Sequence, residues 1–181
     1  MIKSFERVKF KKLMSESSFS ERKRVKENVE RFIITLDKKI WINKFFAIYW
    51  PLKDEVDLRE LKKKYPLALP KCNSRKRIDF YIWDDSPLIK DKEGIFSPNN
   101  SNLLNSRQIS YIFVPCLSVD KQLNRLGYGG GYYDKLRAYK DWRLIPCIGV
   151  LTNKCVSKSF LTKDYWDIPL SGIITDNEIL I

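Results

Sequence analysis

The stretch ISYIFVPCLSVDKQLNRLGYGGGYYDK, residues 109–135, decides the fold class of this chain. It opens with the apolar run 109–114, which has the length and the β-branched and aromatic content of a buried strand and is bounded by Pro115. It then passes through a glycine-rich loop into residues 131–140, which we predict to be a helix. A buried strand, a glycine loop and a helix in this order are typical of an α/β fold.

Short apolar runs on either side of this stretch continue the alternation. The predicted strands are residues 45–50, 67–69, 78–83, 144–150 and 172–176. No internal repeat, low-complexity tract or linker divides the chain. We therefore predict one α/β domain, residues 1–181, with a mostly parallel central sheet.

Helices are predicted to precede the first strand. Residues 2–14 place apolar side chains among charges, as a surface helix does. After a polar break we expect Ser20 to cap a second helix, whose apolar positions out to Ile40 would form one buried stripe. Residues 57–64 are predicted to form a further short helix with Asp57 as its cap.

Composition excludes several classes of protein. The chain has 181 residues, of which 44% are hydrophobic, so it can bury a core and is not disordered. It has no histidine, which excludes a Ser-His-Asp triad, a Cys-His dyad and histidine-ligated zinc. No apolar run suits a membrane helix, and the charged N-terminal segment lacks the apolar part of a signal peptide. We therefore expect a cytoplasmic protein with no membrane partner.

The cysteines argue against metal and redox chemistry. The chain has four of them, Cys72, Cys116, Cys147 and Cys155, and no two form a CxxC pair. A zinc cluster or a thioredoxin-type site is therefore not expected. Each cysteine stands alone in an apolar context, so we predict four buried thiols in a reducing compartment.

The chain is strongly basic. Its formal net charge is +12, and the excess of Lys and Arg is largest in residues 1–64. Such charge suits a nucleic acid or a smaller polyanion, but before any motif is considered a solvated lysine-rich surface is the favoured explanation. No recognisable RNA- or DNA-binding motif accompanies the charge, so we expect no nucleic-acid partner.

Four of the seven glycines lie within residues 127–131. Glycine costs about 0.5–1 kcal/mol relative to alanine in regular structure, so this concentration indicates more than a tight turn. A loop of this kind lets backbone N–H groups approach an anion, and Arg125 and Asp134 flank it. Neither GxxxxGK[ST] nor GxGxxG is present, since Tyr132 stands in the place of the last glycine. The residues alone predict an anion-binding loop, with a nucleotide as the favoured ligand.

The run RLGYGGGYYDK, residues 125–135, resembles the signature of the 5-formyltetrahydrofolate cyclo-ligase family, also called 5,10-methenyltetrahydrofolate synthetases. Further segments resemble other parts of the family pattern in the same order: residues 48–61, 67–72, 109–120 and 166–176. The resemblance thus extends over most of the chain. It implies a three-layer α/β/α sandwich with N-terminal helices ahead of the central sheet.

The resemblance implies an enzyme, 5-formyltetrahydrofolate cyclo-ligase. Such an enzyme converts 5-formyltetrahydrofolate and MgATP into 5,10-methenyltetrahydrofolate, ADP and phosphate. Phosphorylation of the formyl oxygen would create a leaving group, and nitrogen 10 of the folate would attack the activated carbon. Phosphoryl transfer needs positioning and positive charge more than a protein nucleophile, so a chain without histidine can perform it. The implied partners are ATP and the folate, with or without a polyglutamate tail, and we expect a monomer.

Family roles carry over to individual residues of this sequence. Catalytic roles are implied for Arg125 and Tyr133, with Arg125 countering charge on the transferred group. ATP binding is implied for Lys3, Arg7, Arg125, Leu126, Gly127, Gly129, Gly130, Gly131, Tyr132 and Tyr133. Lys3 and Arg7 are four residues apart and therefore share one face of the predicted helix.

The remaining implied roles concern the folate and the metal. Folate contacts are implied for Trp50, Glu55, Tyr128 and Tyr132. Magnesium would be bound by Asp134 and Asp167, which is sufficient because Mg²⁺ typically takes one or two carboxylates and completes its shell with substrate phosphates. Ordinary explanations compete with these roles: aromatic residues often belong to the core, Asp134 suits the first turn of a helix, and Asp167 suits a turn.

The sequence departs from the usual family pattern at Ser97, Cys116, Val119 and Trp166. Trp166 stands where relatives often have histidine, which weakens the assignment of Asp167. Three alternatives therefore stay open: a nucleic-acid-binding module, another ATP- or sugar-phosphate-binding enzyme that shares only the loop, and a folate-binding protein without catalysis.

Overall fold

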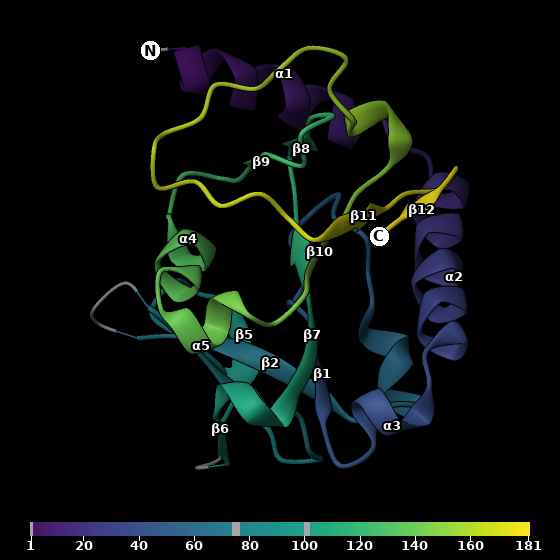
Figure 1. The fold of residues 1–181 in the computed structure, drawn as a ribbon, viewed down its shortest axis with the longest axis vertical. Coiled ribbons are helices and arrows are strands. Elements are labelled where there is room, and N and C mark those ends of the chain that lie inside the picture. Colours follow the sequence, from purple (N-terminus) through teal and green to yellow (C-terminus); the bar gives the residue numbers. More distant parts are fainter. Residues whose placement is uncertain (1, 74–76, 100–101) are drawn as a thin grey trace.

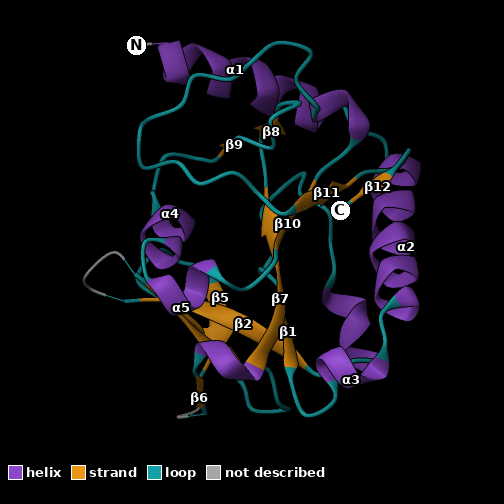
Figure 2. Ribbon diagram, viewed as in Figure 1, coloured by secondary structure: helices purple, strands orange, loops and turns teal. Residues whose placement is uncertain are grey.

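The structure, a computed structural model, describes residues 2–73, 77–99 and 102–181 (Figure 1). Within these residues an eight-stranded sheet forms the centre of the molecule (Figure 2). In spatial order its strands are β12 (Ile179–Leu180), β11 (Gly172–Ile174), β10 (Cys147–Val150), β7 (Ile109–Pro115), β1 (Phe45–Ala47), β2 (Leu67–Cys72), β3 (Ile78–Ile82) and β6 (Leu103–Leu104).

The centre of this sheet is parallel. Strands β11, β10, β7, β1 and β2 pair in parallel, while β12, β3 and β6 add antiparallel edges. Strand β10 is buried along its whole length, as expected for a strand covered on both faces. The prediction of an α/β fold with a mostly parallel sheet is confirmed.

Helices cover both faces of the sheet. The helices are α1 (Ile2–Ser15), α2 (Phe19–Thr35), α3 (Lys38–Trp41), α4 (Tyr132–Arg137) and α5 (Lys140–Arg143). In Figure 1, α2 and α3 lie on one side of the sheet and α4 and α5 on the other, while α1 crosses beyond the ends of the central strands.

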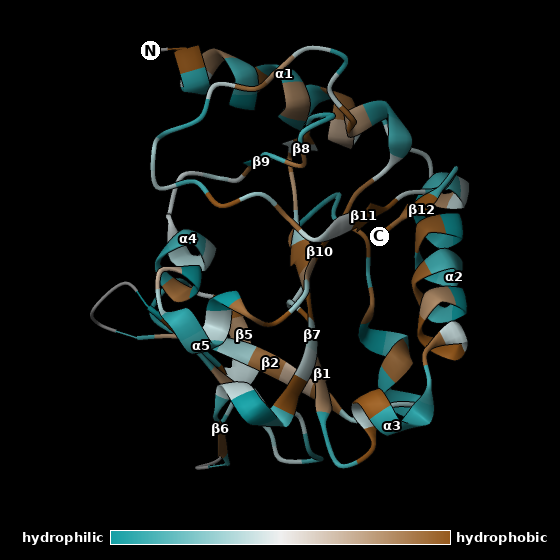
Figure 3. Cartoon of the chain, in the orientation of Figure 1, coloured by the Kyte–Doolittle hydropathy of each residue, from teal (hydrophilic) through white to brown (hydrophobic). Residues whose placement is uncertain are grey.

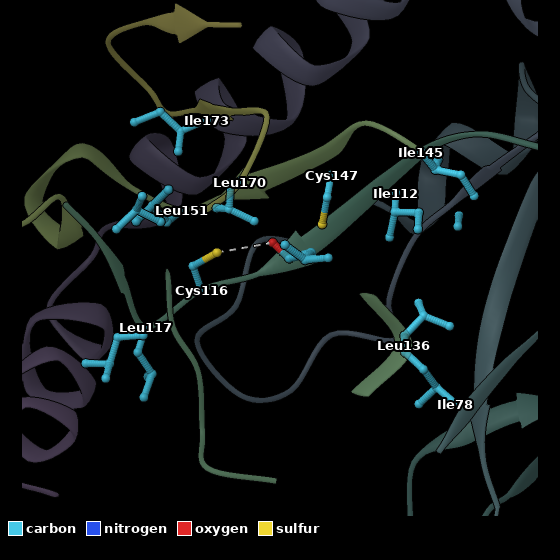
Figure 4. Packing of buried hydrophobic residues seen from close by; sticks show 14 of the residues in the cluster. Ile78, Ile112, Cys116, Leu117, Leu136, Ile145, Cys147, Leu151, Leu170 and Ile173 are labelled. Carbon is cyan, nitrogen blue, oxygen red and sulfur yellow. Dashed lines mark hydrogen bonds between the residues drawn. The ribbon is translucent and has the colours of Figure 1, made fainter. Parts of the chain in front are cut away.

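Alternation along the strands divides the core into two clusters. In β7, Ile112 and Val114 pack into the cluster that includes residues of α1 and α4, whereas Phe113 between them packs into the cluster that includes α2. Figure 4 shows Cys116 and Cys147 among the aliphatic side chains of the first cluster. The three layers predicted from the resemblance are therefore present.

Helix α2 starts and ends differently from the prediction. Ser18, and not Ser20, is its cap: the Ser18 hydroxyl accepts from the N–H of Glu21 at 3.1 Å, and the Glu21 carboxylate accepts from the N–H of Ser18 at 2.6 Å. The chain leaves the helix after Thr35, so Ile40 lies in α3 and is 44% exposed. Figure 3 shows hydrophilic and hydrophobic residues side by side along α2, as its single buried stripe requires.

Two other predicted helices are shorter than expected. Residues 57–64 form only a 3-10 helix, η1 (Arg59–Lys63). Leu58, and not Asp57, is its N-cap residue, although the Asp57 carboxylate accepts from the N–H of Arg59 at 2.9 Å. The predicted helix 131–140 divides into α4 and α5, because the backbone of Tyr139 is extended.

Several short elements were not predicted. They are the sheet strands β6 and β12, together with β4 (Leu88–Lys90), β5 (Phe96–Pro98), η2 (Ser106–Gln108), β8 (Ser118–Val119), β9 (Arg125–Leu126) and η3 (Asn153–Cys155). Strands β8 and β9 form a hairpin between β7 and the glycine loop, so Arg125 belongs to a strand. No helix in the described part of the chain is long and apolar enough to cross a membrane.

The prediction of four buried thiols is wrong at one position. All four cysteines are free, and Cys116, Cys147 and Cys155 are buried. Cys72 is only partly buried, because it ends β2 beside an open cavity.

Candidate functional site

A cavity of about 560 Å³ lies at the carboxyl ends of the central strands. Cys72 at the end of β2, Pro115 at the end of β7 and Trp50 just after β1 line one side of it. Residues of α1 and of the glycine loop line the other side. Open parallel sheets commonly bind their ligands at this edge, where loops from several strands converge.

All the site residues predicted from the sequence line this one cavity. They are Lys3, Arg7, Trp50, Glu55, Arg125, Leu126, Gly127, Tyr128, Gly129, Gly130, Gly131, Tyr132, Tyr133, Asp134 and Asp167. They come from the N-terminal helix, the segment after β1, the glycine loop and the segment before β11. The fold therefore assembles the predicted set from four distant parts of the chain.

Arg125 provides a largely buried positive charge at the glycine loop. Its side chain is 11% exposed, and its Nη2 lies 3.3 Å from Oδ1 of Asp134. Its Nη1 donates to the carbonyl of Pro115 at 3.4 Å, and its guanidinium lies 5.3 Å from the centre of the Tyr133 ring. Burial alone would lower the pKa of Arg125, but the Asp134 carboxylate and neighbouring groups raise it overall, so the guanidinium stays charged.

The glycines of the loop are required for two different reasons. A Cβ at Gly127 would lie 2.9 Å from Nη1 of Arg125, so this glycine leaves room for the guanidinium. Gly129 and Gly131 have φ values of +101° and +68°, which side chains other than glycine adopt rarely. The glycines therefore let the loop adopt this backbone conformation and leave room for the Arg125 guanidinium beside it.

Helix α1 contributes two cations from one face. Arg7 donates from Nε to the carbonyl of Gly127 at 3.0 Å and so holds the glycine loop. Lys3, one turn earlier, places Nζ 2.7 Å from Oδ2 of both Asp164 and Asp167. Partial burial alone would lower the pKa of Lys3, but the hydrogen bonds to the two carboxylates raise it overall.

Glu55 gives the cavity a buried acid. It is 8% exposed, and its Oε2 accepts from the N–H of Leu52 at 2.7 Å. Its Oε1 is buried without a hydrogen-bond partner among the described residues. Burial raises the pKa of Glu55. An unpaired buried acceptor facing a cavity fits a ligand that donates a hydrogen bond.

Aromatic residues also line the cavity. Trp50 packs against Trp83 and Phe96, with ring centres 6.0 and 5.3 Å away. Tyr128 donates from its hydroxyl to Sδ of Met14 at 3.4 Å. Trp50 and Tyr128 give the cavity flat apolar surface, which suits a planar ligand.

Tyr132 and Tyr133 start α4 and have different surroundings. Burial raises the pKa of Tyr132, and a hydrogen bond with Glu93 raises it further. Tyr133 lies against Arg125, and its pKa is raised chiefly by burial. Both phenols are therefore neutral at physiological pH and act as hydrogen-bonding or packing groups.

The acidic groups suit a magnesium ion that completes its shell with phosphates or water. Asp134 and Asp167 provide carboxylate oxygens, which Mg²⁺ prefers, and both line the cavity. Each carboxylate also pairs with a cation of the protein, Arg125 or Lys3. No group of three or more Cys, Asp or Glu residues in the described chain could hold a metal by itself. The residues therefore fit a magnesium ion that takes its remaining ligands from phosphates and water.

Sequence reasoning missed Asp164 and Glu93, which also line the cavity. Asp164 reaches it in a loop without regular structure, and Glu93 lies between β4 and β5, a hairpin that no hydrophobic pattern indicated. Of the four departures from the family pattern, Ser97, Cys116 and Val119 are buried, whereas Trp166 is 54% exposed and lines the cavity.

Comparisons with known proteins identify relatives of this chain. The sequence model of the 5-formyltetrahydrofolate cyclo-ligase family matches residues 3–176. The 5-formyltetrahydrofolate cyclo-ligase of Haemophilus influenzae is 36% identical over 93 residues, which span about half of each protein, 50% of this chain and 49% of the relative. That of Mycoplasma genitalium is 30% identical over 132 residues, or 72% of each protein.

Two solved structures share the fold. The 5,10-methenyltetrahydrofolate synthetase of Aquifex aeolicus has a TM-score of 0.80 at 31% identity, and the match covers 99% of this chain and 92% of that one. The synthetase of Mycoplasma pneumoniae has a TM-score of 0.70 at 27% identity, covering 97% and 99%. With its fold shared and residues 3–176 matched by the family model, the chain belongs to the 5-formyltetrahydrofolate cyclo-ligase family of enzymes.

Proposed function

We propose that this protein converts 5-formyltetrahydrofolate and MgATP into 5,10-methenyltetrahydrofolate, ADP and phosphate. The observation that carries the proposal is one cavity lined by two chemically different sets of groups. The first set is the glycine loop with the cations Lys3, Arg7 and Arg125, and the second is the buried acid Glu55 with aromatic rings. A polyanion and a flat, hydrogen-bonding heterocycle can thus meet in the same space.

The cations that line the cavity suit ATP phosphates. Arg125 is charged, fixed by Asp134 and largely shielded from water, so it can offset developing negative charge without reorganising. Arg7 and the loop glycines line the cavity beside it. A magnesium ion held by Asp134, Asp167 and the phosphates would supply further positive charge.

The buried acid Glu55 suits the pterin of the folate. The unpaired Oε1 of Glu55 can accept hydrogen bonds from the amino and ring N–H groups of the pterin. Trp50 and Tyr128 line the cavity near it and provide apolar surface. Because pairing would satisfy a buried acceptor, this contact favours a ligand with donors over one without them.

Bond changes can then follow without a protein nucleophile. The γ-phosphoryl group passes from ATP to the formyl oxygen, and ADP leaves. Nitrogen 10 attacks the formyl carbon and loses its proton, and the carbon–oxygen bond breaks as phosphate departs with the former formyl oxygen. The chain contributes binding, orientation and charge, with Arg125 against the transferred group.

An absorbance assay tests the proposal. The purified protein, mixed with 5-formyltetrahydrofolate and MgATP, should produce the near-ultraviolet absorbance of the methenyl product. Omission of ATP, magnesium or the folate should abolish it. Absence of product with all components present would refute the proposed reaction. ATP hydrolysis that is indifferent to folate would instead support a different ATP-dependent enzyme.

A further inference from the structure

Lys3 places an ammonium group directly between two carboxylates of a distant loop. Its Nζ lies 2.7 Å from Oδ2 of Asp164 and 2.7 Å from Oδ2 of Asp167, although the residues are more than 160 positions apart. The two proposed roles of these side chains therefore conflict. Lys3 cannot bind phosphate, nor Asp167 a metal, while they are fully engaged with each other.

We propose that the Lys3 ammonium and a divalent cation compete for Asp164 and Asp167, and that ATP decides the competition by drawing Lys3 onto its phosphates. The proposal rests on the proposed function and deepens it. It makes Asp164, which sequence reasoning missed, a partner of Asp167 in holding the metal. It also means that Lys3 occupies the position between the two carboxylates until nucleotide and metal arrive together.

The Asp167 carboxylate is held in place independently of Lys3. The N–H of Asp164 donates to Oδ2 of Asp167 at 2.8 Å, and the N–H of Asp167 donates to the carbonyl of Asp164 at 3.1 Å. This turn fixes the Asp167 carboxylate beside the backbone of Asp164. The Asp164 side chain is 43% exposed, so it has room to turn toward a metal bound at Asp167 when the ammonium leaves.

Helix α1 is also held without the Lys3 contacts. The Glu6 carboxylate accepts from the N–H and the hydroxyl of Thr162 at 3.1 and 3.2 Å, and Arg7 donates to Gly127. Phe10 and Met14 anchor the helix in the core. Lys3 lies in the first turn of this anchored helix, so its long side chain can move while the backbone stays docked.

The chemistry favours exchange when both ligands are present. A divalent ion carries twice the charge of an ammonium group and prefers carboxylate oxygens, so it gains from taking the pair. Lys3 loses two anionic partners and gains phosphates in the same cavity, so its charge stays compensated. Nucleotide and metal should therefore strengthen each other's binding, and removing Lys3 should free the carboxylates for metal alone.

Direct measurement of metal binding tests this exchange. Mn²⁺ affinity is measured without nucleotide or folate, by electron paramagnetic resonance or calorimetry, for the wild type, Lys3→Met and the matched control Lys12→Met, an exposed lysine of the same helix. We expect Lys3→Met to bind Mn²⁺ about tenfold more tightly, because the competing charge is gone. Lys12→Met should match the wild type. Lys3→Gln serves as a second neutral replacement. Mn²⁺ binding by both variants that is equal to or weaker than that of the wild type would overturn the proposal.

A double variant tests the role of Asp164. Asp164→Asn, added to Lys3→Met, should remove the gain in Mn²⁺ affinity, whereas persistence of the full gain would exclude Asp164 from the site. Thermal denaturation establishes that each variant is folded. The measurement involves no turnover, so a negative result leaves the proposed reaction standing. If the metal-binding results are as expected but no methenyl product forms, only the proposed reaction is contradicted.

Discussion

The Arg125 guanidinium and the Asp134 carboxylate face each other across the glycine loop, with Nη2 and Oδ1 3.3 Å apart. Arg125 comes from β9 before the loop, and Asp134 comes from the first turn of α4 after it. The pair therefore joins the two ends of the loop and fixes a charge beneath it. Its separation exceeds that of a tight ion pair, so Asp134 keeps capacity for a second cation.

Replacing Arg125 with lysine tests whether the fixed guanidinium acts in catalysis. Lysine keeps the charge but cannot contact both Pro115 and Asp134, so we expect kcat/KM to fall about 10²–10³-fold, as when one preorganised donor is removed. Methenyl formation measures the effect, with Arg31→Lys on the exposed surface of α2 as the control. Unchanged turnover in folded Arg125→Lys protein would remove Arg125 from the mechanism.

Gly127→Ala tests the fit between the loop and this arginine. The added Cβ would lie 2.9 Å from Nη1 of Arg125, so the guanidinium must move and turnover should fall at least about tenfold. If the effect acts through the arginine, Gly127→Ala should cost much less in the Arg125→Lys background. A double-mutant cycle on kcat/KM measures this coupling, and strictly additive losses would argue against it.

We expect Glu55→Gln to have opposite effects on the stability of the protein and on folate binding. The pKa of Glu55 is raised in the folded protein, so the folded state holds this proton more tightly than the unfolded chain. The buried charge therefore costs little below the unfolded pKa, and its cost grows as pH rises through the folded pKa. Glu55→Gln should raise the melting temperature at pH 8 but not at pH 4, and should weaken folate binding.

Calorimetric melting at both pH values, with the exposed Glu16→Gln as the control, checks the first effect. A folate titration checks the second. An equal change in melting temperature at both pH values would show that the Glu55 charge is not the cause. Undiminished folate affinity would remove Glu55 from the substrate site.

The cysteines should be unreactive in the folded protein. Burial raises the pKa of Cys72 and of Cys116 to about 12 and that of Cys147 to about 11, and it also raises the pKa of Cys155. Thiolate is the reactive form, so at pH 8 the thiols should react with Ellman's reagent far more slowly than a free cysteine. All four should react after denaturation. One rapidly labelled thiol in native protein, lost in Cys72→Ser, would show that the cavity leaves Cys72 ionisable.

The sequence pattern predicted which helices and strands are present better than it predicted where each one begins and ends. The apolar run of β7 and the stripe of α2 are read directly from neighbouring residues, because burial imposes a periodicity on them. The cap of α2 was misplaced by two residues, since both Ser18 and Ser20 precede the apolar stripe and only the backbone decides between them. The hairpin of β8 and β9 escaped prediction because two-residue strands carry no periodic signal.

The sequence by itself determined the class of fold, the glycine loop and the membership of this family, since these depend on residue type and order along the chain. Only the tertiary structure decided that Lys3 lies between Asp164 and Asp167, that Arg125 is buried beneath the loop, and that Glu55 keeps an unpaired oxygen. Strand order in the sheet brings these distant groups together. Their partners and burial, and hence their charges, depend on neighbours that no local pattern specifies.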